Sequence, residues 1–106
     1  MSDALEVHVT MPNADTARSI GRTLVQERLA ACVNVVPGVV SIYSWNGALH
    51  EDDEVVCLIK TSPERFERLR ARVVELHPYD VPEVIAFAVD DGSREYLDWV
   101  RSSTAD

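Results

Sequence analysis

Two side chains of this sequence are of the kinds that bind a soft metal ion: the thiol of Cys32 and the imidazole of His77. A thiolate selects Cu(I), and a neutral imidazole suits copper and zinc. The other histidines, His8 and His50, and the second cysteine, Cys57, complete no H-x-H, H-x₃-H or C-x-x-C spacing, so a structural zinc site is not expected. The alternative is that both cysteines are small buried apolar residues and that His77 is bonded to backbone or to a neighbouring subunit.

A second group of side chains falls at strand ends or in the loop between the second helix and the last strand. An aromatic wall with a lysine, a histidine and a carboxylate would line a polar cleft between subunits and suit a small anionic or mixed ligand. The alternative is an intersubunit network of hydrogen bonds and salt bridges. The group contains Tyr43, Trp45, Lys60, His77, Tyr79 and Glu83, with Tyr43 and Trp45 expected from a neighbouring copy.

An acidic run follows His50 at residues 51–54, E-D-D-E. Carboxylate oxygens suit hard cations, so the run can hold such an ion loosely. It lacks the spacing of a calcium-binding loop, which favours a solvated turn instead.

The composition bounds what the chain can be. At 106 residues with 46% hydrophobic side chains, it predicts one globular domain over residues 1–106, loose only at residues 1–4 and 102–106. The formal net charge of −8 argues against a nucleic-acid partner. No apolar run approaches the ~20 residues of a membrane helix, and the first residues lack a signal-peptide pattern. A cytoplasmic location is expected, which also suits free thiols.

The elements that must position these residues follow from periodicity and turn signals. Strands are expected at 5–10, 30–36, 39–45, 54–60 and 84–89, with turns at Pro37-Gly38 and Asn46-Gly47. Helices are expected from Asn13 or Asp15 to about residue 29, from Ser62 to residue 76, and briefly after Ser93. The order strand, helix, strand, strand, helix, strand, with a short last helix, predicts an α+β ferredoxin-like sandwich: an antiparallel sheet with an extended β-hairpin.

The stretch from residue 27 to 47 has an unusually large apolar content for a ribbon, and Tyr43 and Trp45 lie near its tip. Such a ribbon exposes unpaired strand edges and large side chains, which a monomer leaves open to aggregation. We therefore expect it to pack on copies of itself.

Several motifs in order resemble those of the CutA-type divalent-cation tolerance family. They are E-R-L-A-A-C-V-N at 27–34, P-G at 37–38, S-I-Y-S-W-N-G at 41–47, K-T at 60–61, H-P-Y-D-V-P-E at 77–83 and Y-L-D-W at 96–99. The resemblance covers about residues 6–99. It implies a ferredoxin-like protomer in a tight homotrimer, with a non-enzymatic role in tolerance of copper and other divalent metals.

The resemblance also bears on single residues. Cys32 and His77 stand at the cysteine and the histidine of the family motifs. Some members have a further cysteine late in the first strand and a histidine before H-P-Y, where this chain has Val9 and Leu76; a usual proline late in the last strand is Ala88 here. Neither Val9 nor Leu76 can bind a metal.

Three other functions stay open on the sequence. A trimeric small-ligand sensor resembling the P-II type signalling proteins would use the cleft between subunits. An enzyme would use His77 or Glu83 as a general base, although no second partner stands at a recognisable spacing. A purely structural trimer would bind no ligand at all.

Overall fold

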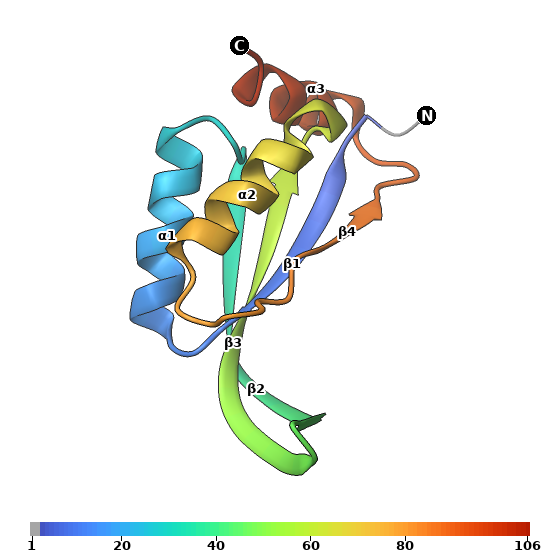
Figure 1. The fold of residues 1–106 in the computed structure, drawn as a ribbon. Coiled ribbons are helices and arrows are strands. Elements are labelled where there is room, and N and C mark those ends of the chain that lie inside the picture. Colours follow the sequence, from blue (N-terminus) through green and yellow to red (C-terminus); the bar gives the residue numbers. More distant parts are fainter. Residues whose placement is uncertain (1–2) are drawn as a thin grey trace.

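The structure, a computed structural model, describes residues 3–106. In chain order the elements are β1 (Leu5–Met11), α1 (Ala14–Gln26), β2 (Cys32–Trp45), β3 (Ala48–Thr61), the short 3₁₀ helix η1 (Pro63–Arg65), α2 (Phe66–Leu76), β4 (Ile85–Ala88) and α3 (Arg94–Ser103) (Figure 1). Across this described part of the chain, no helix is long and apolar enough to cross a membrane.

The strands form one antiparallel sheet in the order β2-β3-β1-β4. Helices α1 and α2 cover one face of it, and α3 crosses the end of the sheet (Figure 1). The predicted ferredoxin-like fold is therefore confirmed. The opposite face carries no helix along most of its length (Figure 1). The β2–β3 hairpin extends beyond the helices and curves toward its tip (Figure 1).

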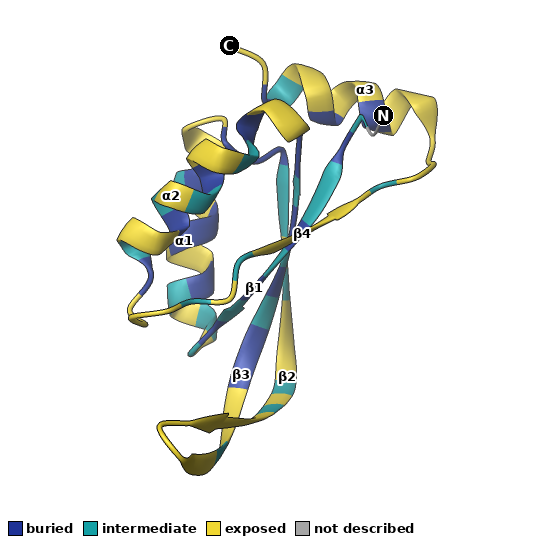
Figure 2. Cartoon of the chain, turned by 45° about the vertical axis from the view of Figure 1, so that its right-hand side comes forward, coloured by how far each residue is buried: buried dark blue, intermediate teal, exposed yellow. Residues whose placement is uncertain are grey.

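The main core lies between the two helices and the sheet, as the apolar periods predict. Alternate residues of β1 point into it, and the helices add residues three and four apart. Its buried members are Val7, Val9, Met11, Ala17, Ile20, Leu24, Leu29, Ala30, Val55, Cys57, Ile59, Leu69 and Val73. Outside the core, the hairpin tip and all of β4 are exposed in the single chain (Figure 2).

The predicted turn at Pro37-Gly38 is wrong, because these residues form a β-bulge within β2. Val36 pairs with Val56 and Val39 pairs with Glu54, so the strand keeps its direction along β3 on both sides of the extra residue. A proline is tolerated there since β2 is an edge strand, and Gly38 takes the positive φ of 82°. The strand instead turns at Asn46-Gly47, where both residues have positive φ as predicted.

Two further boundaries differ from expectation. Helix α1 ends at Gln26 and not near residue 29, because Arg28 takes a left-handed φ of 60° and the amides of Leu29 and Ala30 bond back to Leu24. The acidic run at 51–54 belongs to β3 and is not a turn. The predicted strands at 30–36 and 39–45 are one continuous β2, which is only partly buried in the single chain.

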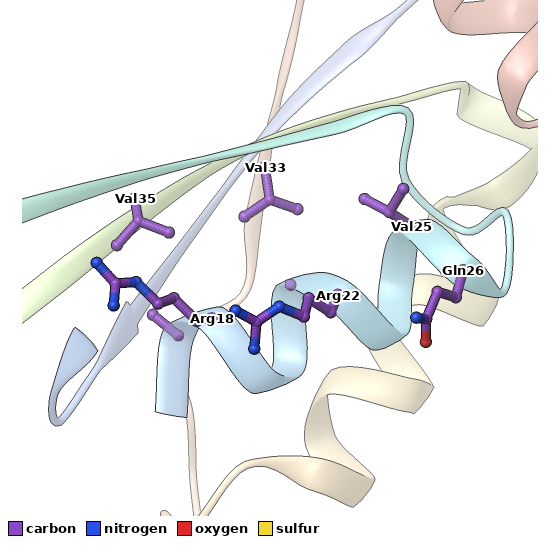
Figure 3. Close-up of a pocket in the computed structure, with 8 residues that line it drawn as sticks. Arg18, Arg22, Val25, Gln26, Val33 and Val35 are labelled. Atoms are coloured by element: carbon purple, nitrogen blue, oxygen red, sulfur yellow. The ribbon is translucent and has the colours of Figure 1, made fainter. Parts of the chain in front are cut away.

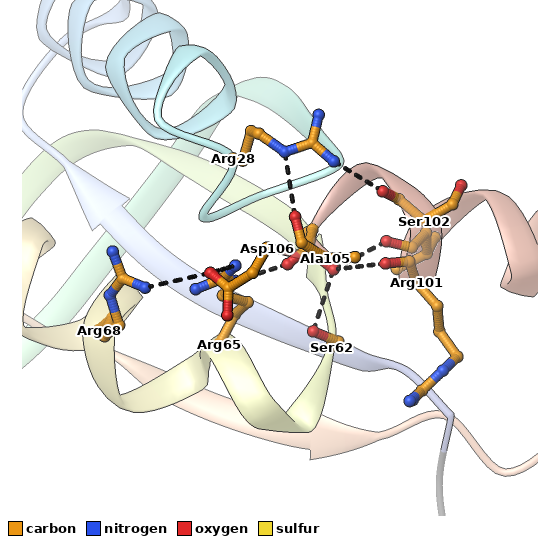
Figure 4. Close-up of polar contacts among 10 residues, drawn as sticks. Arg28, Ser62, Arg65, Arg68, Arg101, Ser102, Ala105 and Asp106 are labelled. Atoms are coloured by element: carbon orange, nitrogen blue, oxygen red, sulfur yellow. Dashed lines mark hydrogen bonds and ion pairs between the residues drawn. The ribbon is translucent and has the colours of Figure 1, made fainter.

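The C-terminal residues are held in place, so the prediction that residues 102–106 are loose is wrong. Arg65 is buried and donates to the carbonyl of Thr104 and to the carboxylate of Asp106 (Figure 4). Arg28 donates to the carbonyls of Ser102 and Ala105. At the other end, Met1 and Ser2 lie outside the described residues, and Ala4 is buried.

Candidate functional site

A hollow of about 610 Å³ lies between the bent hairpin and the loop at residues 77–83. Its walls are mainly aromatic and acidic. The side chains that give it this character are Tyr43, Trp45, His50, Asp52, Glu54, Tyr79, Asp80 and Glu83. A cavity of this size lies within the range of sites that bind small molecules.

The strand register explains why the hairpin residues meet at this hollow. Tyr43 pairs with His50, Ser41 with Asp52, and the next pair along the hairpin contains Glu54. Paired residues and every second residue along a strand share a face of the sheet. The hairpin therefore presents these polar and aromatic side chains together, on the face that has no helix.

Two tyrosine hydroxyls bind the carboxylates of the hollow. The Tyr43 hydroxyl donates to Asp52 at 2.5 Å, and the Tyr79 hydroxyl donates to Glu54 at 2.8 Å. The bond to Asp52 raises the pKa of Tyr43, and burial, followed by the bond to Glu54, raises the pKa of Tyr79. Both hydroxyls therefore keep their protons near neutral pH and act as donors.

His77 does not line the hollow, but it is buried and bonds to Thr10 and Tyr79, two residues that do. Its Nδ1 accepts the backbone N–H of Tyr79 at 3.1 Å, so the ring proton sits on Nε2, which donates to the carbonyl of Thr10 at 2.8 Å. The imidazole also lies 4.7 Å from the ring of Tyr79, centroid to centroid. With both nitrogens engaged, His77 positions Tyr79 and has no free lone pair for a metal.

Lys60 does not reach the hollow within one chain. Its ammonium donates to Asn34 at 2.8 Å and lies 3.6 Å from Glu6, at the opposite end of the sheet. Lys60 and Glu54 are six positions apart along β3, or about 20 Å. The structure thus brings together, within one chain, four of the predicted cleft residues: Tyr43, Trp45, Tyr79 and Glu83. The sequence predicts a cleft between subunits, with Tyr43 and Trp45 from a neighbouring copy, and a single chain does not test that arrangement. The residues that line the hollow include neither His77 nor any lysine or arginine.

The two cysteines are free thiols in different surroundings. Cys57 is fully buried in the core, and this burial raises its pKa to about 11. Cys32 is half-buried at the start of β2, on the face opposite α1 and α2, beside Tyr96 of α3. Burial first, and then the nearby Cys32, raises the pKa of Tyr96.

Cys32 and His77 are not brought together in one chain. Cys32 pairs with Lys60 of β3. His77 bonds to Thr10, and Thr10 pairs with Val56 of β3. Lys60 and Val56 are four positions apart on this strand, a separation of about 13 Å. Within residues 3–106, no group of three or more histidine, cysteine, aspartate or glutamate side chains is close enough to hold a metal ion.

A smaller groove of about 350 Å³ runs between α1 and the edge strand β2 (Figure 3). Arg18 and Arg22 of α1 line one side of the groove, and Val33 and Val35 of β2 line the other. Gly21 allows this close packing, because an added Cβ would lie 3.3 Å from a methyl carbon of Val33. The helical period places the arginines outside the apolar face of α1 but does not indicate the groove.

Sequence reasoning also misses the acidic half of the main hollow. It places Asp52 in a solvated turn and Glu54 where that turn meets the strand predicted at 54–60, and it groups neither with the aromatic residues. The signal that could have found them is the alternation after Asn46-Gly47, which puts His50, Asp52 and Glu54 on one face if the strand starts directly after the turn.

Comparison with known proteins gives consistent matches. The sequence matches the family described as CutA1 divalent ion tolerance protein over residues 5–103. The divalent-cation tolerance protein CutA of Thermus thermophilus is 52% identical over 98 residues, 92% of this chain and 95% of that protein. Human protein CutA is 48% identical over 91% of this chain, which spans only 54% of the human protein's length.

Solved structures agree with these matches. The divalent cation tolerance protein of Thermus thermophilus aligns with a TM-score of 0.93 at 50% identity, over 96% of this chain and 99% of that chain. CutA of Xylella fastidiosa aligns with a TM-score of 0.95 at 42% identity, over 98% and 100% respectively. The same four-stranded sheet and helical layer are thus found in experimental structures.

Proposed function

The chain belongs to the CutA1 divalent ion tolerance family, and from this premise we propose that it acts in divalent-cation tolerance as a homotrimer that binds its ions without catalysing a reaction. The observation that carries the proposal is the match at about half identity over nearly the whole chain. The exposed apolar surface of the sheet and the hydrogen bonds of His77 also support it.

Exposed apolar surface supports self-association. Ile85 and Phe87 of β4 and Val36 of β2 lie exposed on the sheet, and both strands are edges with unpaired backbone groups. Burial of such surface against further copies would remove an aggregation hazard and supply the main driving force of assembly.

The geometry of His77 supports binding over catalysis. A general base needs a free lone pair within reach of the proton that it takes. The lone pair of His77 on Nδ1 already accepts the N–H of Tyr79. Glu83, the other candidate base, lines the hollow beside further carboxylates and has no described basic partner there.

For copper, the ligand that we propose is the thiol of Cys32, the more accessible of the two cysteines. The family motif also points to His77, but that imidazole would have to give up a hydrogen bond to coordinate. Any complete site then needs ligands from more than one copy, since the described residues of one chain form no cluster.

Titration with Cu(I), Cu(II) and Zn(II) tests the metal proposal. We expect saturable copper binding that Cys32→Ser abolishes and that the matched control Cys57→Ser leaves intact, because Cys57 is enclosed in the core. His77→Ala measures the part played by the imidazole. Absence of a saturable site, or a site indifferent to Cys32→Ser, rejects the metal proposal.

A second candidate function is a trimeric small-ligand sensor that uses the hollow. The specific observation in its favour is the assembly of four carboxylates and three aromatic rings around one cavity of about 610 Å³. This function does not depend on copper binding at Cys32, which lies far along the sheet from the hollow.

A further inference from the structure

We propose that the hollow between the hairpin and the loop at 77–83 binds a small organic cation, held by Glu54 and the rings of Tyr43 and Tyr79. The proposal rests on the second candidate function, the small-ligand role of the hollow, and names its ligand class. It is independent of copper binding at Cys32, because the residues of the two sites do not overlap.

The first observation is a buried carboxylate without a counter-ion. Glu54 is only 8% exposed, and the hydrogen bond that it receives comes from the neutral hydroxyl of Tyr79. None of the ion pairs found among residues 3–106 includes it. Removing a carboxylate from water is costly unless a cation compensates, so the hollow is suited to receive positive charge.

The second observation is the aromatic lining. Tyr43, Trp45 and Tyr79 all lie at the hollow, and each keeps a substantial part of its ring exposed in the single chain. The faces of such rings attract organic cations. A guanidinium group combines this stacking with paired hydrogen bonds to a carboxylate and sheds water more easily than an ammonium group.

The third observation separates an organic cation from a metal ion. The carboxylates around the hollow, on Asp52, Glu54, Asp80 and Glu83, line it without converging into a cluster that could hold a metal. The cavity of about 610 Å³ is also far larger than a bare ion needs. A ligand with an apolar body and a charged head fills such a space and contacts both the rings and the carboxylates.

Charge also makes this hollow a poor site for a small anion. The small anion that the sequence suggests belongs to a cleft between subunits that contains Lys60, and within one chain Lys60 lies elsewhere on the sheet, bound to Asn34 and Glu6. Four carboxylates repel an anion.

The test is isothermal titration of the full-length protein with n-butylguanidinium chloride and, as the neutral isostere, n-butylurea. Glu54→Gln removes the buried charge with little change in shape. Glu51→Gln is the matched control, because Glu51 is exposed on the same strand and does not line the hollow. Circular dichroism and light scattering establish that each variant keeps its fold and assembly.

We expect the wild type to bind n-butylguanidinium at one site per chain and to bind n-butylurea at least about tenfold more weakly. Glu54→Gln should weaken guanidinium binding at least about tenfold, and Glu51→Gln less than about twofold. Should Glu54→Gln fail to fold, Asp52→Asn takes its place. The proposal is overturned if the wild type binds no guanidinium, if the urea binds equally well, or if the folded variant and its control lose affinity alike.

Discussion

The Tyr79 hydroxyl lies 2.8 Å from the carboxylate of Glu54 and joins the loop after α2 to the middle of β3. On the other side of the same residue, the backbone N–H of Tyr79 bonds to His77, which is itself anchored on β1 through Thr10. A chain of three hydrogen bonds thus fixes the loop that closes one side of the hollow. Because these bonds connect the loop to β1 and β3, the fold itself fixes the position of this side of the hollow.

Replacement of Tyr79 by Phe tests this connection. The substitution keeps the ring but leaves the buried Glu54 carboxylate without its described donor, so the free energy of unfolding should fall by about 1–2 kcal/mol. Urea denaturation at fixed protein concentration measures it. Tyr43→Phe is the control, since its partner Asp52 is exposed and the loss of this bond should cost less. Equal losses in the two variants would contradict the assigned role of Glu54 burial.

The cysteines should differ sharply in reactivity. Cys57 is fully buried with its pKa raised from 9.0 to about 11, so the native protein should alkylate with iodoacetamide at Cys32 and not at Cys57 near pH 8. Mass spectrometry of peptides reads the two sites separately. Unfolding in urea should make both react, which controls for reagent access. Equal alkylation of the two thiols in the native protein would refute the burial of Cys57.

The pKa of Cys57 also gives a pH dependence with a definite sign. Because the folded pKa lies above the ordinary value, the neutral thiol contributes stability that is complete below pH 9. That contribution is lost as pH rises through about 11. Cys57→Ala should therefore lose less stability than the wild type between these two pH values, as measured by urea denaturation at each pH. A parallel loss would count against the buried thiol.

Two neighbouring arginines that differ in burial allow a controlled test of the contacts made by the C-terminal residues. Arg65 and Arg68 both approach Asp106, but the side chain of Arg65 is 9% exposed and that of Arg68 is 66% exposed (Figure 4). Arg65→Met should reduce the free energy of unfolding by about 2–3 kcal/mol, because it also frees the buried carbonyl of Thr104. Arg68→Met should cost less than about 0.5 kcal/mol. Similar costs would show that burial of Arg65 is unimportant.

The assembly has its own test in solution. Light scattering should give a mass three times the 11.8 kDa of the chain. Phe87→Asp places a charge on the exposed apolar part of β4 and should dissociate the trimer. Val74→Asp, a similarly exposed position on α2, should leave it assembled. A monomeric wild type, or a trimer that survives Phe87→Asp, contradicts the proposed use of the sheet.

Local patterns predict much of the fold. The alternation of residues 5–10 indicates β1, Asn13 caps α1 through a bond to the amide of Thr16, and Asn46-Gly47 forms the hairpin turn. The bulge at Pro37-Gly38 is not predictable in this way, because a proline–glycine pair also favours a turn. Only the pairing of both flanking segments with β3, a contact distant in sequence, distinguishes the two.

The site is harder to predict for a similar reason. The aromatic residues of the hollow can be identified, but the sequence places Tyr43 and Trp45 beside Lys60 of a neighbouring copy and does not show that they meet Tyr79 of their own chain. The acidic partners Asp52 and Glu54 are not grouped with these aromatic residues, because a run of charges does not show strand alternation. The buried role of Arg65 depends on α3 and the C-terminal residues packing against η1, which no local pattern indicates.

A crystal structure of the protein grown with n-butylguanidinium tests the central claim, that the hollow is a binding site for a cation, most directly. We predict planar density within hydrogen-bonding distance of Glu54 and against the ring of Tyr79, repeated in each copy of a trimer. A hollow filled by a side chain of a neighbouring copy, or left without guanidinium density at concentrations that saturate the titration, would contradict it.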